Sequence, residues 1–145
     1  GMGSGISGMI AARDALGLTT KIVGVVAENA PAYALSFAKG EAVSTNTANT
    51  LADGVACRTP DAAAVSIINK GADRIVSVSE DEITHAMGCY FTDTHNLAEG
   101  AGAVPLAALL KEKDQIAESC VGLVLSGGNV DRSLFSQVLK TPLGA

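Results

Sequence analysis

The opening segment GMGSGISG, residues 1–8, has a glycine spacing suited to binding an anion. Gly3, Gly5 and Gly8 form a G-x-G-x-x-G pattern, and glycines leave room for consecutive backbone amides to converge on phosphate oxygens. Helical periodicity begins near Gly5, so these amides would lie at the positive end of a helix dipole. The residues predict a phosphate-binding loop at the start of a helix.

Two interpretations of this loop stay open from the residues alone. Glu28 follows the last glycine by about 20 residues, at the end of an expected strand, which is the spacing of a dinucleotide-binding motif. That motif requires a strand that leads into the loop, and very little sequence precedes Gly3. An isolated dinucleotide-binding unit would lack its first strand, whereas anion binding is expected under either interpretation.

Three further segments place very small residues beside a polar one. Gly54 lies in TLADGVA, Glu99 precedes the run GAGAV, and Ser126 precedes two glycines in VLSGGNVD. A hydroxyl at the end of a strand, beside backbone without side chains, suits the edge of a flat ligand. Taken alone, the last segment favours a plain strand-to-helix turn capped by Asn129 or Asp131.

The elements that position these residues alternate between strand and helix. Nearly continuous β-branched runs predict buried strands at 21–27, 74–79 and 121–126. Helices are expected at 5–16, from after Asn29 to before Gly40, from Thr59 to near Gly71, from Ser79 to about His95, at 105–111 and at 132–139. This order predicts an α/β fold with a mostly parallel sheet, helices on both faces, and a ligand at the carboxyl ends of the strands.

Local signals fix several ends of these elements. Gly17 suits the C-terminal cap of the first helix, and Pro31 the first turn of the second. Ser79 and Glu82 have the spacing of a capping box. The first helix is expected to bury one face, formed by Ile6, Met9, Ile10 and Ala12. Residues 40–58 have no sustained period and are expected to form a long ordered loop.

Composition limits the classes of partner. The 145 residues fit one α/β domain, residues 1–145, and the net charge of −5 with scattered Lys and Arg argues against nucleic acid. No apolar run approaches the roughly 20 residues that cross a bilayer. We therefore expect a soluble, cytoplasmic protein.

Cysteine and histidine do not indicate a metal or a disulfide. Cys57, Cys89 and Cys120 are widely separated, so we expect buried, reduced thiols. His85 and His95 share no helical face and have no third ligand candidate, so we expect surface or packed histidines.

Taken together in this order, the segments GMGSGISG, TLADGVA, VSEDEI, AEGAGAVPLAALL and VLSGGNVD resemble the fold-type II pyridoxal-phosphate enzymes, in particular threonine and serine dehydratases and serine racemase. The resemblance covers nearly the whole chain and corresponds to about the C-terminal half of such enzymes. It implies the large-domain part of the tryptophan synthase β-like fold.

The resemblance also implies the residues that bind the cofactor. The phosphate would lie on the amides of the opening segment, Gly1, Met2, Gly3, Ser4 and Gly5. Gly54 and Glu99 would line the ring, and Ser126 would hydrogen-bond the pyridine nitrogen. A neutral hydroxyl does not enforce protonation of that nitrogen, which suits β-elimination of a hydroxy amino acid to a keto acid and ammonia.

This chain departs from the family pattern at three places. The family commonly has four consecutive glycines where this chain has Gly1-Met2-Gly3-Ser4. Acidic residues that hold a structural cation in some members are expected at positions taken here by Val26 and Ala32, so we expect no metal site. The Schiff-base lysine lies in a Ser-x-Lys-x-Arg segment of the N-terminal half, and none of this chain's lysines has that context: Lys21, Lys39, Lys70, Lys111, Lys113 and Lys140.

The resemblance therefore implies the cofactor-phosphate-binding part of an ammonia-lyase, with no catalytic residue in this chain and no activity on its own. Its partners would be the missing N-terminal half and an amino acid substrate. Two alternatives remain. One is a dinucleotide-binding module that uses Gly3, Gly5, Gly8 and Glu28, and the other is a non-catalytic domain that covers its sheet edge by forming a homodimer.

Overall fold

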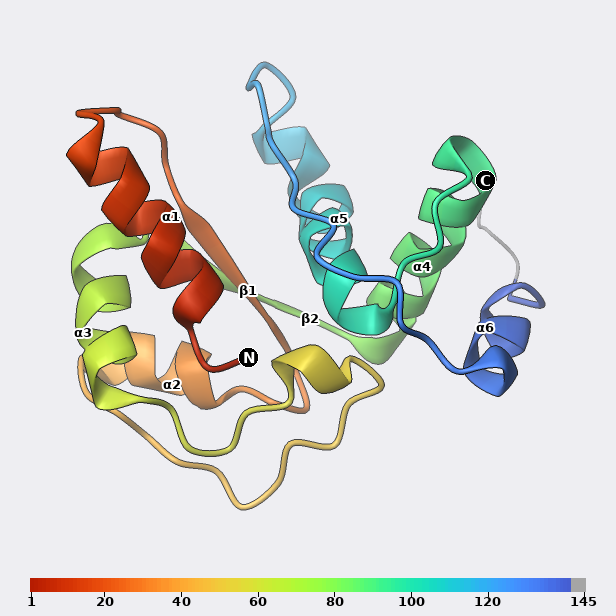
Figure 1. The fold of residues 1–145 in the computed structure, drawn as a ribbon, viewed down its shortest axis with the longest axis horizontal. Helices are drawn as coiled ribbons and strands as arrows, with labels where there is room; N and C mark the ends of the chain where they lie inside the picture. The colour runs from red at the N-terminus through yellow and green to blue at the C-terminus, as the bar shows by residue number, and fades with distance from the viewer. Residues whose placement is uncertain (142–145) are drawn as a thin grey trace. The chain divides into compact units, whose positions relative to one another are not determined.

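The computed structural model describes residues 1–141 and divides the chain into two compact units (Figure 1). The first unit contains residues 1–50 and 55–77, and the second contains residues 51–54 and those from 78 onward. The last residues of the expected domain, 142–145, lie outside the described part.

The first unit is built on two paired parallel strands, β1 (Val23–Ala27) and β2 (Arg74–Val78). The last residue of β2, Val78, belongs to the second unit. Three helices accompany the strands, α1 (Ser4–Ala15), α2 (Ala32–Lys39) and α3 (Ala62–Gly71). Two of the three expected strands and the first three expected helices are therefore present. Asp61 caps α3 by accepting a hydrogen bond from the Ala64 amide at 2.8 Å.

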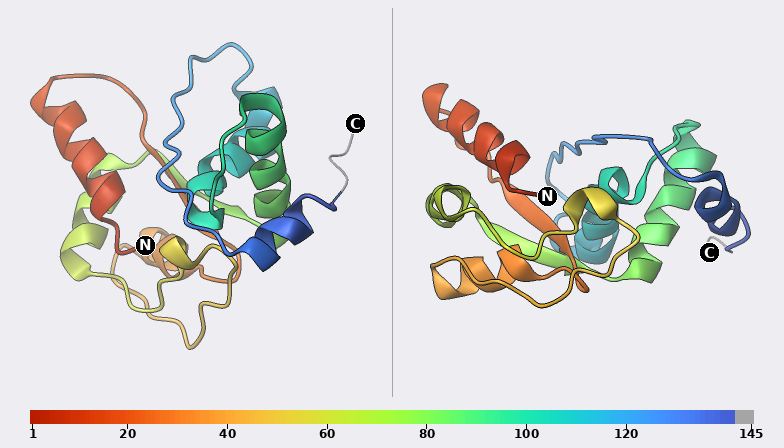
Figure 2. Two further views of the ribbon diagram at one scale, coloured as in Figure 1. Left: turned by 45° about the vertical axis from the view of Figure 1, so that its right-hand side comes forward. Right: turned by 60° about the horizontal axis from the view of Figure 1, so that its bottom comes forward.

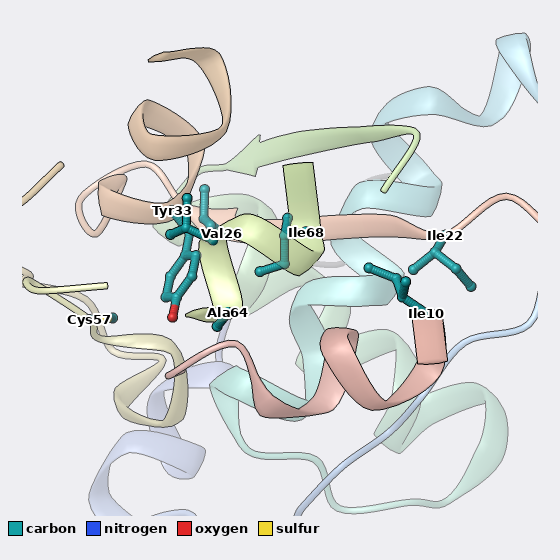
Figure 3. Close-up of a cluster of buried hydrophobic side chains, with 8 residues drawn as sticks. Ile10, Ile22, Val26, Tyr33, Cys57, Ala64 and Ile68 are labelled. Atoms are coloured by element: carbon teal, nitrogen blue, oxygen red, sulfur yellow. The ribbon is translucent and has the colours of Figure 1, made fainter. Parts of the chain in front are cut away.

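The core of the first unit lies between α1, β1 and α3 (Figure 3). Its buried members come from these three elements, from α2 and from the segments between them: Ile10, Ile22, Val26, Tyr33, Cys57, Ala64, Val65 and Ile68. A Cβ on Gly71 would collide with the side chain of Ile10, so α1 approaches α3 where α3 has no side chain. Arg13 Nη1 also donates to the Gly71 carbonyl at 2.8 Å and ties the same two helices.

The second unit contains α4 (Glu80–Thr94), α5 (Gly100–Glu112) and α6 (Arg132–Val138). It also contains the 3-10 turn Lys113–Gln115 and most of the 3-10 turn Asp53–Val55, of which Val55 belongs to the first unit. The helices α4 and α5 pack side by side (Figures 1 and 2). Their facing residues are fully or almost fully buried: Ile83, Ala86, Met87, Ala103, Val104 and Ala107. The edge-to-face pair of Phe91 and Phe135, with ring centroids 5.4 Å apart, joins α4 to α6.

The capping box at the start of α4 is confirmed. Ser79 Oγ accepts from the Glu82 amide at 3.1 Å, and Glu82 Oε2 accepts from the Ser79 amide at 2.7 Å. The Lys111 ammonium lies 3.1 Å from the same carboxylate and connects α5 to this cap.

The expected strand at residues 121–126 is wrong. This segment has no regular secondary structure, and Val121 and Val124 are 44% and 53% exposed. A strand is stable only beside a paired neighbour, and within the described residues the sheet contains β1 and β2 alone. The expectation of a buried thiol at Cys120 fails for the same reason, since the residue is exposed beside this irregular segment.

Two helix expectations also need correction. The helix expected at 105–111 starts earlier, at Gly100, although its first turn contains two glycines of low helix propensity, both of them buried. In α1 the predicted face is only partly buried. Ile10 is buried and Ile6 packs against the core, but Met9 is 45% exposed and Ala12 is exposed, because the contact between α1 and α3 covers a narrow stripe of α1.

Candidate functional site

The glycine loop of the first unit forms the start of α1. Gly3 is the N-cap residue and has φ 85°, a left-handed conformation that glycine adopts without strain. The Gly3 carbonyl accepts from the Ser7 amide at 3.0 Å and closes the first helical turn. The amides of Ser4, Gly5 and Ile6 have no acceptor inside the helix, because the first turn of any helix leaves its donors unpaired. These exposed donors at a helix N-terminus are suited to a phosphate group.

Space beneath the loop is restricted at Gly3. A Cβ at this position would lie 2.9 Å from the Tyr33 hydroxyl oxygen and 2.9 Å from Ala64 Cβ. The Tyr33 hydroxyl donates to the Met2 carbonyl at 2.5 Å and accepts from the Asp61 amide at 3.2 Å. The loop therefore rests on α2 and on the N-terminus of α3, and only glycine fits at its third position.

The second unit brings the other three glycine-containing segments together. The Glu99 amide donates to the Gly127 carbonyl at 3.0 Å. A Cβ on Gly102 would lie 2.6 Å from that same carbonyl oxygen, and a Cβ on Gly54 would lie 2.8 Å from Ala101 Cβ and 3.9 Å from Glu99 Oε1. Residues far apart in the sequence thus converge around the N-terminus of α5.

Glu99 lies at the centre of this group. Its half-buried side chain reaches Gly127, where a Cβ would lie 2.6 Å from Glu99 Oε1. Ser126, the residue before Gly127, is exposed. The second unit therefore holds a carboxylate, an exposed hydroxyl and bare glycine backbone close together, which is the arrangement expected at the edge of a flat polar ligand.

The predicted site residues are thus distributed over both units. Gly54, Glu99 and Ser126 gather in the second unit, while Gly1, Met2, Gly3, Ser4 and Gly5 form the loop of the first. Their roles toward a cofactor stay predictions.

Sequence reasoning missed residues that support these groups. Tyr33 reaches the glycine loop across 31 positions, and Glu80 Oε2 accepts from the Leu51 amide at 2.8 Å and anchors the segment that carries Gly54. Neither residue has a spacing signal, because their partners are backbone atoms brought near by the fold.

Burial raises the pKa of the Tyr33 phenol above its ordinary value, and the hydrogen bond from the Asp61 amide opposes this rise only in part. The phenol is consequently neutral at physiological pH and keeps its proton to donate to Met2. In the second unit, burial also raises the pKa of Tyr90.

Glu28 lines a hollow of the first unit that lies apart from the glycine loop. This open hollow of about 360 Å³ is lined by Glu28, Asn29, Pro31, Thr45, Thr47 and Asn49. No residue of the glycine loop lines it, so Glu28 and the loop do not share this hollow as a dinucleotide site would require. Among residues 1–141 no group of three or more His, Cys, Asp or Glu side chains is placed to hold a metal ion.

The glycine loop and the group around Glu99 each fit pyridoxal phosphate, taken separately. The doubly charged phosphate ester matches the free amides and the glycine-only position at Gly3. The ring would need a polar partner beside open backbone, which Ser126 and Gly127 supply.

Comparisons with known proteins agree with this chemistry. The chain is 34% identical over 143 residues to the L-threonine ammonia-lyase of Thermotoga maritima, covering 99% of this chain and 35% of that protein. It is 38% identical over 140 residues to the catabolic L-threonine dehydratase of Escherichia coli, covering 95% of this chain and 43% of that protein. The chain therefore spans less than half the length of these relatives.

Solved structures give the same result. A threonine deaminase from T.th. superposes with a TM-score of 0.84 at 33% identity, over 90% of this chain and 48% of that one. Maize serine racemase superposes with a TM-score of 0.85 at 26% identity, over 96% of this chain and 44% of that one. These neighbours confirm the α/β fold class expected from the sequence.

The model of the family described as "Pyridoxal-phosphate dependent enzyme" matches residues 1–127. Most of the sequence, including both the glycine loop and the group around Glu99, lies inside this match. The chain belongs to the pyridoxal-phosphate dependent enzyme family.

Proposed function

We propose that this chain is the part of a threonine or serine dehydratase-like ammonia-lyase that binds the phosphate and the pyridine ring of pyridoxal phosphate. The whole enzyme would eliminate the β-hydroxyl of a hydroxy amino acid and release a keto acid and ammonia. Support comes from the names of the relatives, threonine ammonia-lyase and threonine dehydratase, and from the neighbouring threonine deaminase.

Each predicted residue has a defined task in this proposal. The amides of Gly1, Met2, Gly3, Ser4 and Gly5 bind the phosphate. Gly54 leaves room for the ring, the Glu99 side chain borders it, and the Ser126 hydroxyl binds the pyridine nitrogen. Bound pyridoxal phosphate supplies an electron sink for cleavage of bonds at the substrate's α-carbon. Because Ser126 is a neutral partner, it leaves that nitrogen free to stay unprotonated.

The proposed reaction also needs residues that this chain does not supply. None of its lysines has the sequence context of the family's Schiff-base lysine, and the relatives are more than twice as long as the matched region. We infer that the remaining part of the enzyme supplies the lysine and most contacts to the amino acid. Association as a homodimer and a cytoplasmic location belong to this proposal.

The observation that carries the proposal is the position of Gly3. Its left-handed backbone and the atoms 2.9 Å from a hypothetical Cβ leave no room for a side chain beneath an exposed turn of amides. A loop with only a structural role would need neither exposed backbone N–H donors nor such close packing against Tyr33 and Ala64. Such a loop is expected where backbone must approach a phosphate directly.

Calorimetric titration of the 145-residue chain tests the proposal. We expect pyridoxal phosphate to bind, pyridoxal without the phosphate to bind at least tenfold more weakly, and inorganic phosphate to compete. Gly3→Ala should abolish binding, while Gly8→Ala should preserve it because nothing lies within 4 Å of a Cβ there.

The same titration distinguishes this proposal from the dinucleotide-binding alternative. Equal binding of pyridoxal and its phosphate ester, or tight binding of NAD with no heat from pyridoxal phosphate, would contradict the proposed role of the loop.

A further inference from the structure

Tyr33 contacts the glycine loop in a way that the proposed function does not explain. The residue is the second of α2, it is only 7% exposed, and its hydroxyl joins Met2 to the first residue before α3. One side chain of α2 therefore bonds both the loop and the N-cap residue of α3.

The hydrogen bonds at this hydroxyl fix its direction. It donates to the Met2 carbonyl at 2.5 Å and accepts from the Asp61 amide at 3.2 Å. A phenol has a single proton to donate, so its donor is committed to Met2. Asp61 is itself held in place as the N-cap of α3, and the phenol is consequently oriented by a rigid element.

The Met2 carbonyl belongs to the peptide unit whose amide is that of Gly3. Turning this carbonyl toward Tyr33 sets the plane of the peptide, and the next carbonyl, of Gly3, is bound by the Ser7 amide at 3.0 Å. Both carbonyl oxygens at the turn are thus occupied within the protein. An anion that approaches the loop meets N–H groups and is not repelled by these oxygens.

The Met2 side chain, although the residue is 58% exposed, makes one further contact within the unit. Its sulfur lies 3.8 Å from Cys57 Sγ, and Cys57 is buried. The chain therefore holds Met2 at two points, which offsets the conformational freedom of a loop rich in glycine.

We propose that Tyr33 is a positioning residue of the phosphate-binding loop, whose hydroxyl holds the Met2 carbonyl away from the anion so that the amides of Gly3, Ser4 and Gly5 stay aimed at it. This rests on the proposed function only for the identity of the anion. The tyrosine acts through the backbone and does not touch the phosphate.

Tyr33→Phe in the 145-residue chain is the direct test, because it removes one oxygen and keeps the ring. Tyr90→Phe is the matched control, since it makes the same change in α4 of the other unit. Titration with pyridoxal phosphate and with inorganic phosphate should give binding about 5- to 10-fold weaker in Tyr33→Phe, as expected for one lost hydrogen bond, and unchanged binding in Tyr90→Phe. Equal affinities in the wild-type chain and Tyr33→Phe would overturn the inference.

Backbone amide exchange, measured by NMR without any ligand, gives a second and independent readout. In Tyr33→Phe the amides of Gly3, Ser4 and Gly5 should shift and exchange faster, while those of α5 should not change. If the wild-type chain binds neither anion, the proposed function fails, and this exchange experiment alone decides the role of Tyr33. Unchanged loop amides would then overturn it.

A third measurement covers the case in which Tyr33→Phe does not fold. Incorporating 3-fluorotyrosine into the Tyr90→Phe chain modifies Tyr33 alone, since the protein has two tyrosines. Fluorination makes the phenol a stronger donor, so the Gly3 amide resonance should move. An unmoved Gly3 resonance would contradict the inference.

Discussion

Two glycines decide where the Glu99 side chain and the Ser126 segment lie. Gly102 permits the contact between α5 and the Gly127 carbonyl, and Gly127 leaves room for the Glu99 carboxylate. The two contacts differ in kind, because a Cβ on Gly127 would meet the movable end of a side chain, whereas a Cβ on Gly102 would meet backbone. A substitution at Gly102 must therefore separate two segments of the chain.

Gly102→Ala tests this difference in stability. Alanine favours a helix interior over glycine by roughly 1 kcal/mol, but its Cβ would lie 2.6 Å from the Gly127 oxygen. We expect the clash to dominate and the free energy of unfolding to fall by about 1 to 3 kcal/mol. Urea denaturation followed by circular dichroism measures it.

Gly8→Ala is the control for helix propensity. Gly8 lies in α1 with nothing within 4 Å of a Cβ, so alanine should raise the free energy of unfolding by about 0.5 to 1 kcal/mol. If Gly102→Ala were as stable as Gly8→Ala, the close approach of α5 to the Gly127 segment would be refuted.

Among single residues, the sequence indicated where glycines are needed but not which side chains hold the glycine segments in place. Gly3, Gly54, Glu99 and Gly127 all lie in segments whose small residues indicated a close approach. Tyr33 could not be predicted, because its partners are a carbonyl and an amide that only the folded chain brings to it.

At the scale of elements, local signals predicted what local interactions determine. The capping box of Ser79 and Glu82 forms as expected, and α2, α3, α4 and α6 lie within a few residues of their predicted ranges. The predicted strand at 121–126 failed because strand formation depends on a neighbour that no local pattern encodes. The early start of α5 was missed because only the folded chain shows that Leu51, Ala52 and Gly127 lie so close to its first turn that glycine is needed there.

The capping box also predicts a pH dependence. Burial by itself raises the pKa of Glu82, but the Ser79 amide and the Lys111 ammonium outweigh it and hold the pKa below the ordinary value of 4.5. The native state therefore binds this proton more weakly than the unfolded chain. Its contribution to stability is present above the unfolded pKa and is lost as the pH falls through the folded pKa.

Glu82→Gln should accordingly unfold at lower urea than the wild-type chain at neutral pH, and the gap should narrow below about pH 4. Urea titrations at several pH values measure the gap. Asp81→Asn is a control on the same helical turn. A gap for Glu82→Gln that stayed constant with pH would contradict the assigned interactions.

At the scale of the molecule, the single domain expected from the length stays a prediction. The chain passes between the two units after residues 50, 54 and 77, and β2 itself continues into the second unit at Val78. Because the backbone passes between the units three times and one strand is shared by both, we expect the two units to unfold cooperatively. Among residues 1–141, none of the helices combines the length and the hydropathy of a membrane-spanning segment.

The two tyrosines provide a test of this cooperativity. The protein has no tryptophan, Tyr33 lies in the first unit and Tyr90 in the second. Tyr90→Phe therefore leaves a fluorophore in the first unit, and Tyr33→Phe leaves one in the second. In each variant, we expect the tyrosine fluorescence and the circular dichroism to change at the same urea concentration. Separate midpoints for the two signals would show that the units unfold independently.

The family of the whole molecule could be predicted from the order of its glycine-containing segments, and the family match over residues 1–127 confirms it. The role of each site residue could not be established in the same way, because it depends on the ligand and on the rest of the enzyme. In the proposed function, this chain supplies the phosphate and pyridine sites but not the lysine.

This division is tested by borohydride reduction of the chain saturated with pyridoxal phosphate, followed by peptide mass spectrometry and an assay for keto acid from threonine and serine. We predict reversible binding that depends on Gly3, no single lysine labelled stoichiometrically, and no keto acid formed. Stoichiometric labelling of one of the chain's own lysines, with formation of keto acid by the chain alone, would show that the chain supplies its own Schiff-base lysine.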